Sequence, residues 1–213
     1  MKIDKKDLLL YAVTDRSWIG KEGLSEQVKE ALEGGVTFLQ LREKTLSREA
    51  FVEEGKKIKA LTEGYRVPFV INDEVEVALA IDADGVHVGQ KDMSAGDVRK
   101  RIGKDKILGV SVRTVEQALL AQAQGADYLG VGTIFTTSTK LDAEHVSMET
   151  LQGICEAVEI PVVAIGGITK ENIHELKGVK IAGIAVVSAI FTNKDIEGAT
   201  RRLREQVENL LNR

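Results

Sequence analysis

One short stretch in the second half of the chain, "GTIFTTSTK" (132–140), places five hydroxyl side chains and one lysine within nine residues. Ser and Thr are common in loops, so one interpretation of this stretch is an ordinary polar loop. The other is an anion site, in which the hydroxyls, backbone N–H groups and the ammonium of Lys140 hold a phosphate. The stretch alone leaves both open, and residues elsewhere in the chain must decide between them.

A second polar group follows the apolar run "VTFLQLRE" (36–43). Alternation along an extended chain places four residues on one face: Phe38, Gln40, Arg42 and Lys44. The two intervening leucines take the other face and should pack against helices. A desolvated guanidinium is costly unless it meets an anion, so Arg42 indicates an anionic ligand. The alternative is an internal Arg–Glu pair that only holds the structure together.

Acidic residues follow two further apolar runs. Asn72 ends the run "VPFVIN" and Asp73 directly follows it. His87 lies inside the run "GVHVG", and Asp92 comes three residues after that run ends. Two carboxylates over a cleft repel each other unless a cation lies between them, and Mg²⁺ suits one or two carboxylates plus substrate phosphates. The alternative is that each aspartate caps the helix after it. His87 could equally be a histidine of the core.

The elements that must position these residues alternate regularly along the chain. Apolar, β-branched runs lie at 8–14, 36–43, 67–72, 85–89, 107–112, 128–132, 161–167 and 181–188, and segments of helical spacing lie between them, for example 24–35, 47–63, 114–126 and 195–212. Near-continuous apolar strands followed by helices predict parallel strands buried on both faces. We therefore predict eight strands and eight helices in one (β/α)8 barrel domain, residues 1–213. A doubly wound open sheet is the runner-up, weakened by the missing G-x-G-x-x-G fingerprint.

In such a barrel the active site lies at the carboxyl ends of the strands, where these polar residues fall. Ser111 lies near the end of the fifth run, at the mouth, and Gly130 and Gly132 remove side chains from one face of the sixth. The loops after strands seven and eight of a barrel often bind phosphate, which points to backbone amides near Gly167 and Ser188. The inventory thus fits one metal-assisted diphosphate and one monophosphate.

Bulk properties limit the partners. The chain has 213 residues, a net charge of −4 and no block of Lys and Arg, which disfavours nucleic acid. Its single cysteine, Cys155, cannot form an internal disulfide and suits a reducing compartment. The apolar stretch near the N-terminus is too short for a signal peptide or a membrane span. We expect a cytoplasmic protein that binds small molecules and no membrane, and we leave a homodimer open.

Seven segments, in order, resemble the thiamine phosphate synthase family: "QLREK" (40–44), "VIND" (70–73), "HVGQKD" (87–92), "GVS" (109–111), "TTSTK" (136–140), "IGGI" (165–168) and "VSAIF" (187–191). The resemblance spans nearly the whole chain. It implies a (β/α)8 barrel transferase of thiamine biosynthesis that needs Mg²⁺. Such an enzyme joins hydroxymethylpyrimidine diphosphate to hydroxyethylthiazole phosphate and releases pyrophosphate.

The resemblance also implies roles for single residues. The metal ligands would be Asp73 and Asp92, and no residue would act as a covalent nucleophile. The pyrimidine diphosphate would be held by Gln40, Leu41, Arg42, Glu43 and Lys44, assisted by Asn72, Ser111 and His87. A phosphate-gripping flap would consist of Thr137, Ser138, Thr139 and Lys140. The thiazole phosphate would be held by Gly167, Val187 and Ser188.

The chain departs from the family at two positions. The family usually has prolines where this chain has Thr133 and Thr136, which predicts a more mobile loop, since proline fixes φ. We expect 132–140 to form a lid that orders over the bound diphosphate and keeps water from a cationic intermediate.

Three rival functions differ in which residues they need. A thiazole tautomerase of the same fold would lack the two aspartates and "QLREK", and a barrel that only senses phosphorylated ligands would lose one aspartate or Lys140. A Schiff-base aldolase needs a lysine inside a strand end, whereas Lys44 and Lys140 lie past their strands. The residues present favour the synthase.

Overall fold

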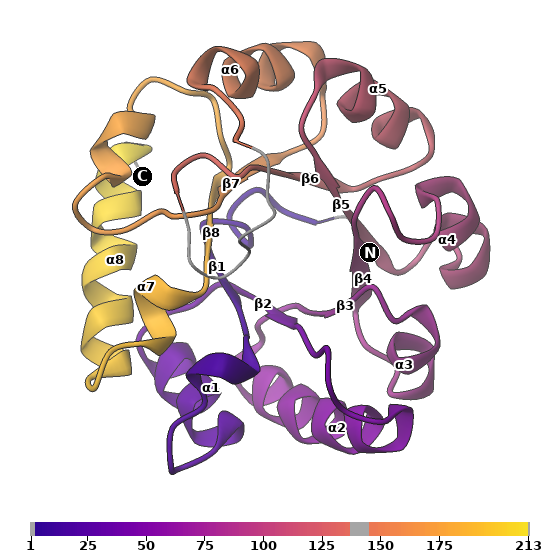
Figure 1. The fold of residues 1–213 in the computed structure, drawn as a ribbon, viewed down its shortest axis with the longest axis vertical. Helices are drawn as coiled ribbons and strands as arrows, with labels where there is room; N and C mark the ends of the chain where they lie inside the picture. Colours follow the sequence, from indigo (N-terminus) through magenta and orange to yellow (C-terminus); the bar gives the residue numbers. More distant parts are fainter. Residues whose placement is uncertain (1–2, 137–144, 213) are drawn as a thin grey trace.

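The computed structural model of the chain describes residues 3–136 and 145–212. Within them a closed barrel of parallel strands runs in the order β1 to β8, with helices around its outside (Figure 1). The strands are β1 (Leu10–Val13), β2 (Phe38–Leu41), β3 (Phe69–Asn72), β4 (Gly85–Val88), β5 (Ile107–Val112), β6 (Tyr128–Val131), β7 (Val162–Ile165) and β8 (Gly183–Val186). The barrel closes where Tyr11 of β1 pairs with Ala185 of β8. This confirms the predicted (β/α)8 barrel.

The helices follow the strands as predicted, with one exception. They are α1 (Leu24–Glu33), α2 (Arg48–Tyr65), α3 (Val75–Ala80), α4 (Ala95–Ile102), α5 (Val115–Ala123), α6 (Met148–Ala157), α7 (Ser188–Phe191) and α8 (Ile196–Leu210). Short 3₁₀ helices η1 (Arg16–Trp18) and η2 (Ile173–Leu176) follow β1 and β7. After β7 the expected α-helix is replaced by η2, because its two apolar residues, at its first and last positions, are both buried by a single tight turn.

The apolar residues form two layers, as expected for strands covered on both faces. The layer between strands and helices contains Leu39 and Leu41, which confirms the outward face predicted for β2. The inner layer contains Tyr11, Phe38 and Tyr128, whose rings pack edge to face with centroids 4.6 to 5.9 Å apart. The barrel interior is therefore a packed aromatic core below the polar mouth.

The inner layer is packed so closely around Gly109 of β5 that it leaves no space for a side chain at this position. A Cβ at this position would lie 2.5 Å from Nδ1 of His87 and closer still to the Tyr128 hydroxyl. We expect Gly109→Ala to lower the free energy of unfolding by about 1–3 kcal/mol through overpacking. Urea denaturation measures this change. Gly64→Ala is the matched control, because a Cβ on this α2 glycine would meet nothing within 4 Å and should be neutral or slightly stabilising. Equal stability of the two variants would refute the packing argument.

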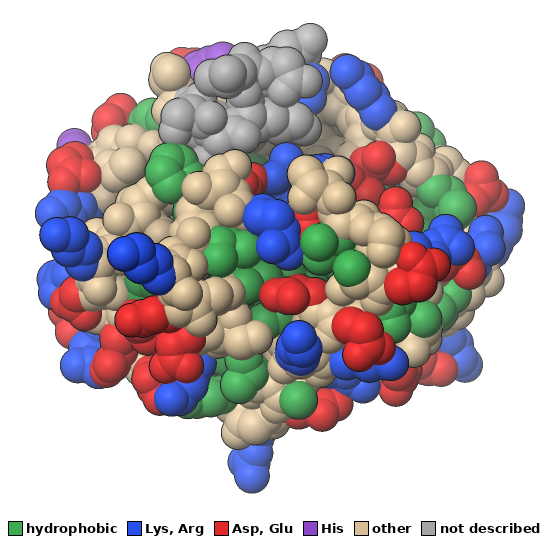
Figure 2. Space-filling model, turned by 60° about the horizontal axis from the view of Figure 1, so that its bottom comes forward, with side chains coloured by type: hydrophobic (Ala, Val, Ile, Leu, Met, Phe, Trp, Pro, Cys, Tyr) green, Lys and Arg blue, Asp and Glu red, His purple; other side chains and the backbone are tan. Residues whose placement is uncertain are grey.

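On the face shown in Figure 2, acidic and basic side chains are intermixed, and neither kind of charge dominates. Several ion pairs of the described part of the chain form within single helices, such as Lys56 with Glu53 in α2 and Arg201 with Glu197 in α8. Among the described residues, no helix combines the length and apolar character needed to cross a membrane.

Candidate active site

Two ion pairs join the segment after β1 to the segment after β2. The guanidinium of Arg42 bonds the Asp15 carboxylate through Nη1, and Nε of Arg16 lies 2.5 Å from Oε2 of Glu43. The hydroxyl of Thr14 accepts the backbone N–H of Arg42 at 3.0 Å and fixes where this side chain starts. The internal partner of Arg42 is therefore an aspartate from the neighbouring strand end, and not the glutamate that the sequence suggested as an alternative.

The ion pair with Asp15 orients the Arg42 side chain but leaves some of its N–H groups available to a ligand. Asp15 is buried, whereas the Arg42 side chain keeps 25% of its surface exposed. A guanidinium has five N–H donors, so a carboxylate bonded at Nη1 leaves others for a ligand. This geometry combines both interpretations of Arg42: an internal ion pair holds it, and the cation still faces the barrel mouth.

Two residues of the "QLREK" segment, Leu41 and Glu43, direct their side chains to protein groups. Leu41 lies in the layer between strands and helices, so only its backbone is near the mouth. The carboxylate of Glu43 accepts the backbone N–H groups of Lys44 and Thr45 at 2.7 and 2.9 Å. Burial opposes ionisation of Glu43, but these bonds and that from Arg16 outweigh it and lower its pKa. Glu43 thus shapes the loop that presents Lys44.

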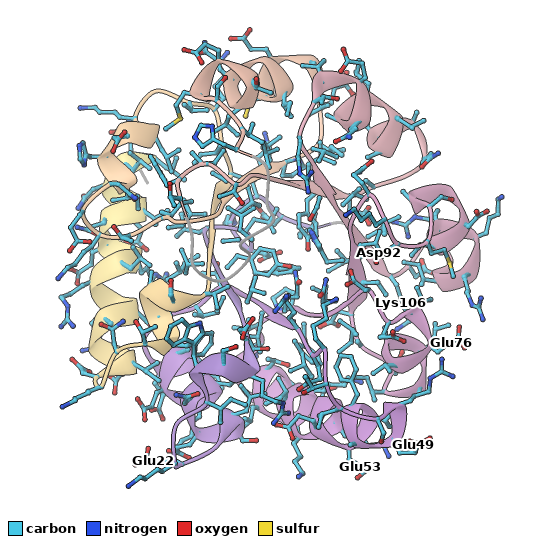
Figure 3. The ribbon with its side chains drawn as sticks, in the orientation of Figure 1. Glu22, Glu49, Glu53, Glu76, Asp92 and Lys106 are labelled. Carbon is cyan, nitrogen blue, oxygen red and sulfur yellow. The ribbon has the colours of Figure 1, made fainter. Side chains whose placement is uncertain are left out.

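The predicted metal ligands, Asp73 and Asp92, come together at the ends of β3 and β4. Their carboxyl groups lie within hydrogen-bonding reach of each other. Nζ of Lys44 lies 2.5 Å from Oδ2 of Asp73, and the Asn72 amide donates to Oδ1 of the same residue at 2.8 Å. Figure 3 labels Asp92 beside the end of β4. Four of the residues predicted for the site thus form one cluster.

The electrostatics of this cluster favour an additional cation. Burial raises the pKa of Asp73, and the negative charge of Asp92 raises it further, while Lys44 opposes both effects. One ammonium therefore does not compensate fully for two carboxylates. A divalent cation between them would remove the repulsion and use the oxygen ligands that Mg²⁺ prefers.

The alternative that both aspartates cap helices is wrong. The N-cap of α4 is Ser94, whose hydroxyl accepts the backbone N–H of Asp97 at 3.2 Å. The N-cap of α3 is Glu74, which makes no side-chain capping bond. Asp73 has the left-handed φ of 61°, rare outside glycine, at the bend that directly follows β3.

Behind this cluster lies a cavity of about 320 Å³ at the carboxyl ends of β2 and β3. Its polar wall contains Arg48 and Glu74 together with the predicted site residues Glu43, Lys44, Asn72 and Asp73. Its apolar wall includes Leu46, Phe51 and Val77.

His87 is buried, and both its ring nitrogens bond protein hydroxyls. Nδ1 lies 2.9 Å from the Tyr128 hydroxyl, and Nε2 lies 2.8 Å from Oγ of Ser111. Burial lowers the pKa of His87 to about 4, against a small opposing effect of Asp92, so the ring is neutral at pH 7. His87 is thus a buried residue bonded to the predicted ligand contact Ser111, and its own contact with the substrate stays a prediction.

The Gln40 side chain lies inside the barrel, below the mouth. Its side-chain amide donates to the hydroxyl of Tyr11, and the residue is buried. This confirms the inward direction predicted from alternation along β2.

The loop after β6 is held by the end of β7 as far as the structure describes it. The backbone N–H groups of Ile134 and Phe135 donate to the carbonyl oxygens of Ile165 and Gly166 at 3.1 and 3.0 Å. Gly167 has a φ of 64°, and a Cβ there would lie 2.5 Å from the Phe135 carbonyl oxygen. Glycine is needed at this position so that the two loops can approach.

The remaining predicted residues fall in two places. Val187 and Ser188 lie where β8 passes into the short helix α7, which begins at Ser188. Since β7 and β8 are paired, they are on the same side of the mouth as Gly167. Thr137, Ser138, Thr139 and Lys140, and with them most of the expected lid, lie outside the described residues.

Sequence analysis missed four residues that support this site: Tyr11, Asp15, Arg16 and Tyr128. A signal existed for Asp15 and Arg16, because they directly follow the first apolar run, at the end of the barrel where the other polar residues collect. No local signal marks the two tyrosines as partners, since their hydroxyls meet 117 positions apart in the chain.

A (β/α)8 barrel whose mouth combines paired carboxylates, exposed cations and glycine-lined loops is a barrel enzyme built for anionic, phosphorylated small molecules. Comparison with known proteins identifies the family within this class of enzymes. The sequence profile described as thiamine monophosphate synthase matches residues 10–190. The chain belongs to this family.

Individual relatives agree over nearly the whole chain. It is 53% identical to the thiamine-phosphate synthase of Ruminiclostridium cellulolyticum, over 94% of this chain and 96% of that one. It is 52% identical to the thiamine-phosphate synthase of Clostridium tetani, over 92% and 94%. Among solved structures, thiamine phosphate pyrophosphorylase from Pyrococcus furiosus superposes with a TM-score of 0.89 at 43% identity, covering 97% of this chain and 98% of that one.

Proposed function

We propose that this enzyme joins hydroxymethylpyrimidine diphosphate to hydroxyethylthiazole phosphate, giving thiamine phosphate and pyrophosphate. The observation that carries the proposal is membership of the thiamine monophosphate synthase family over residues 10–190. The site is compatible with it, because Lys44, Asp73, Asp92 and the partly exposed Arg42 occupy one side of the mouth. The enzyme is a transferase.

The chemistry needs no protein nucleophile. The bond between the pyrimidine methylene carbon and the diphosphate oxygen breaks, and the electron pair leaves with pyrophosphate. The aminopyrimidine stabilises the resulting cation, and the lone pair of the thiazole nitrogen then forms the new carbon–nitrogen bond. The protein has to neutralise the leaving group, align the two substrates and exclude water.

Different residues at the mouth neutralise the leaving group and align the two substrates. Arg42 and Lys44 bind the diphosphate as cations, and Asp15 holds Arg42 in position. Ser111 and Asn72 contact the pyrimidine diphosphate from neighbouring strand ends. Backbone groups around Gly167, Val187 and Ser188 hold the phosphate of the thiazole, so the two substrates meet above the aromatic inner layer.

Mg²⁺ is the proposed metal, and the residues present fit it. Asp73 and Asp92 are two oxygen ligands with uncompensated negative charge. Held by Asp73 and Asp92, the ion would supply positive charge that neutralises the leaving diphosphate.

We expect Mg²⁺ to bind only weakly to the free protein. The residues that the structure describes contain no group of three or more His, Cys, Asp or Glu side chains arranged to hold a metal. Two carboxylates leave an octahedral shell incomplete, so diphosphate oxygens must finish it. Calorimetry should show weak binding of Mg²⁺ alone and a marked gain when pyrophosphate is present. Tight binding to the free protein would show a preformed cage instead.

Pyrophosphate release tests the proposed reaction. Both substrates with Mg²⁺ should give pyrophosphate and thiamine phosphate in equal amounts, and omission of either substrate or chelation of the metal should abolish product formation. A tautomerase would instead convert a thiazole precursor without pyrophosphate release, and a sensor would bind ligands without turnover. Either result would overturn the proposal.

A cytoplasmic location also belongs to the proposal, supported by the lone cysteine. Cell fractionation tests the location. A homodimer stays open as the assembly, and light scattering of the purified protein decides it.

A further inference from the structure

A chain of polar side chains crosses the aromatic inner layer of the barrel. The Gln40 amide donates to the Tyr11 hydroxyl, whose oxygen lies 2.8 Å from that of Tyr128. Tyr128 reaches Nδ1 of His87 at 2.9 Å, and Nε2 of His87 reaches Ser111 at 2.8 Å. Five residues from five different strands thus form one continuous path from β2 to the end of β5.

One direction of the hydrogen bonds along this path uses the N–H or O–H of every group in it. The Tyr11 oxygen accepts the hydrogen bond from the Gln40 amide, which leaves the Tyr11 O–H to donate to Tyr128. Tyr128 then donates to Nδ1 of His87. A neutral imidazole has one N–H, so that proton is on Nε2 and is donated to Ser111. Ser111 accepts on its oxygen, and its own O–H remains for a further acceptor.

The surroundings are shaped for this arrangement. Gly109 lies directly beneath the Tyr128–His87 bond, where a Cβ would collide with both partners. At Gly130 a Cβ would lie 3.2 Å from Cε1 of His87, tight against the imidazole. Burial also raises the pKa of both tyrosines well above the ordinary value, so each phenol keeps the single proton that this direction requires.

We infer that Tyr128 is a positioning residue, which fixes His87 as the Nε2–H tautomer and thereby makes Ser111 a hydrogen-bond donor toward an acceptor atom of the pyrimidine diphosphate. The inference rests on the proposed function for the identity of that substrate. The hydrogen-bond direction itself does not, because it is a property of the substrate-free protein. A donor aimed at the substrate stabilises negative charge on the leaving group, whereas an acceptor at the same place would repel it.

Nitrogen-15 NMR of the histidine rings tests the direction without any turnover. The chain has three histidines, and a His87→Gln variant assigns the signals of His87. We expect Nε2 to carry the proton at pH 7 in the wild-type protein. An Nδ1–H tautomer would mean that the path runs in the opposite direction, and would overturn the inference even if thiamine phosphate forms normally.

Two matched variants separate positioning from packing. Tyr128→Phe and Tyr11→Phe each remove one buried hydroxyl from the same layer and keep the ring. Only Tyr128→Phe removes the donor to Nδ1, so the tautomer preference should be lost there and kept in Tyr11→Phe. If both variants shift the tautomer equally, or neither does, the assignment of Tyr128 as the orienting group is wrong.

A double-mutant cycle shows whether Tyr128 acts through Ser111. We expect Tyr128→Phe to lower kcat about tenfold, with little change in KM for the thiazole phosphate, as for loss of one well-oriented hydrogen bond. In a Ser111→Ala background the same change should cost almost nothing, because the donor that it orients is gone. Additive losses would overturn the inference. A wild-type protein inactive with both substrates would contradict the proposed function instead, and leave the NMR result to decide the direction.

Discussion

Asp92→Asn should lower kcat for thiamine phosphate formation by about 100- to 1,000-fold, the size of effect seen when one preorganised charge-stabilising group is removed. Asparagine keeps the shape and one side-chain oxygen, which can still accept the Gly89 backbone N–H that Asp92 accepts at 2.8 Å. What it loses is the second negative charge next to Asp73. The change therefore removes the reason for a divalent cation to bind there while sparing the loop. Pyrophosphate release at saturating substrates and varied Mg²⁺ measures the effect.

Asp97→Asn is the matched control for this variant. Asp97 lies five positions further on, is well exposed, and pairs with Lys100 on the surface of α4. Its replacement should leave kcat within about twofold, since exposed pairs contribute little. Near-wild-type turnover in Asp92→Asn would show that Asp92 serves only the loop and that the proposed metal site is elsewhere.

The second large effect is expected from Arg42→Lys, which should lower kcat/KM by about 10- to 150-fold, or about 1.5–3 kcal/mol. The guanidinium bonds Asp15 with one nitrogen and has further N–H groups for the diphosphate. An ammonium concentrates its charge on one nitrogen and lacks the planar fork, so it cannot hold the buried carboxylate and the substrate in the same geometry. Steady-state kinetics with varied pyrimidine diphosphate measures the loss.

Arg201→Lys provides the comparison, because Arg201 also pairs with an acidic residue, Glu197, but on the exposed face of α8. That change should be nearly silent. If Arg42→Lys is as active as Arg201→Lys while retaining stability, Arg42 only pairs with Asp15 and does not bind substrate.

The strands were predictable from sequence because their signal is local. Each apolar run corresponds to one strand, and alternation along β2 placed Gln40 inward and Leu39 and Leu41 outward as observed. The carboxyl ends of parallel strands meet at one end of a barrel, so the sequence alone predicts that Asp73 and Asp92 lie close together. Periodicity and topology together therefore account for the fold and for the carboxylate pair.

A local signal could also have removed one alternative. Ser94 precedes Asp97 by three residues, the spacing at which a hydroxyl caps a helix. This identifies Ser94 as the N-cap of α4 and frees Asp92 for another role. The position of Ser94 thus argues against a capping role for the exposed Asp92.

The partners of Arg42 and His87 could not be predicted in this way. Asp15 and Arg42 are 27 positions apart, and Tyr128 and His87 are 41 apart. Which inward side chains touch depends on the height of each strand in the barrel and on gaps left by Gly109 and Gly130. Those are properties of the assembled interior, which alternation along one strand does not encode.

One crystal structure tests the central claim most directly: the protein with thiamine phosphate, pyrophosphate and Mn²⁺, in which anomalous scattering locates the metal. We expect a metal peak bonded to Asp73 and Asp92 and to pyrophosphate oxygens, with Arg42 and Lys44 on the same pyrophosphate and the thiazole phosphate near Gly167 and Ser188. Pyrophosphate and metal bound away from both carboxylates, with the product still in the barrel mouth, would contradict that claim.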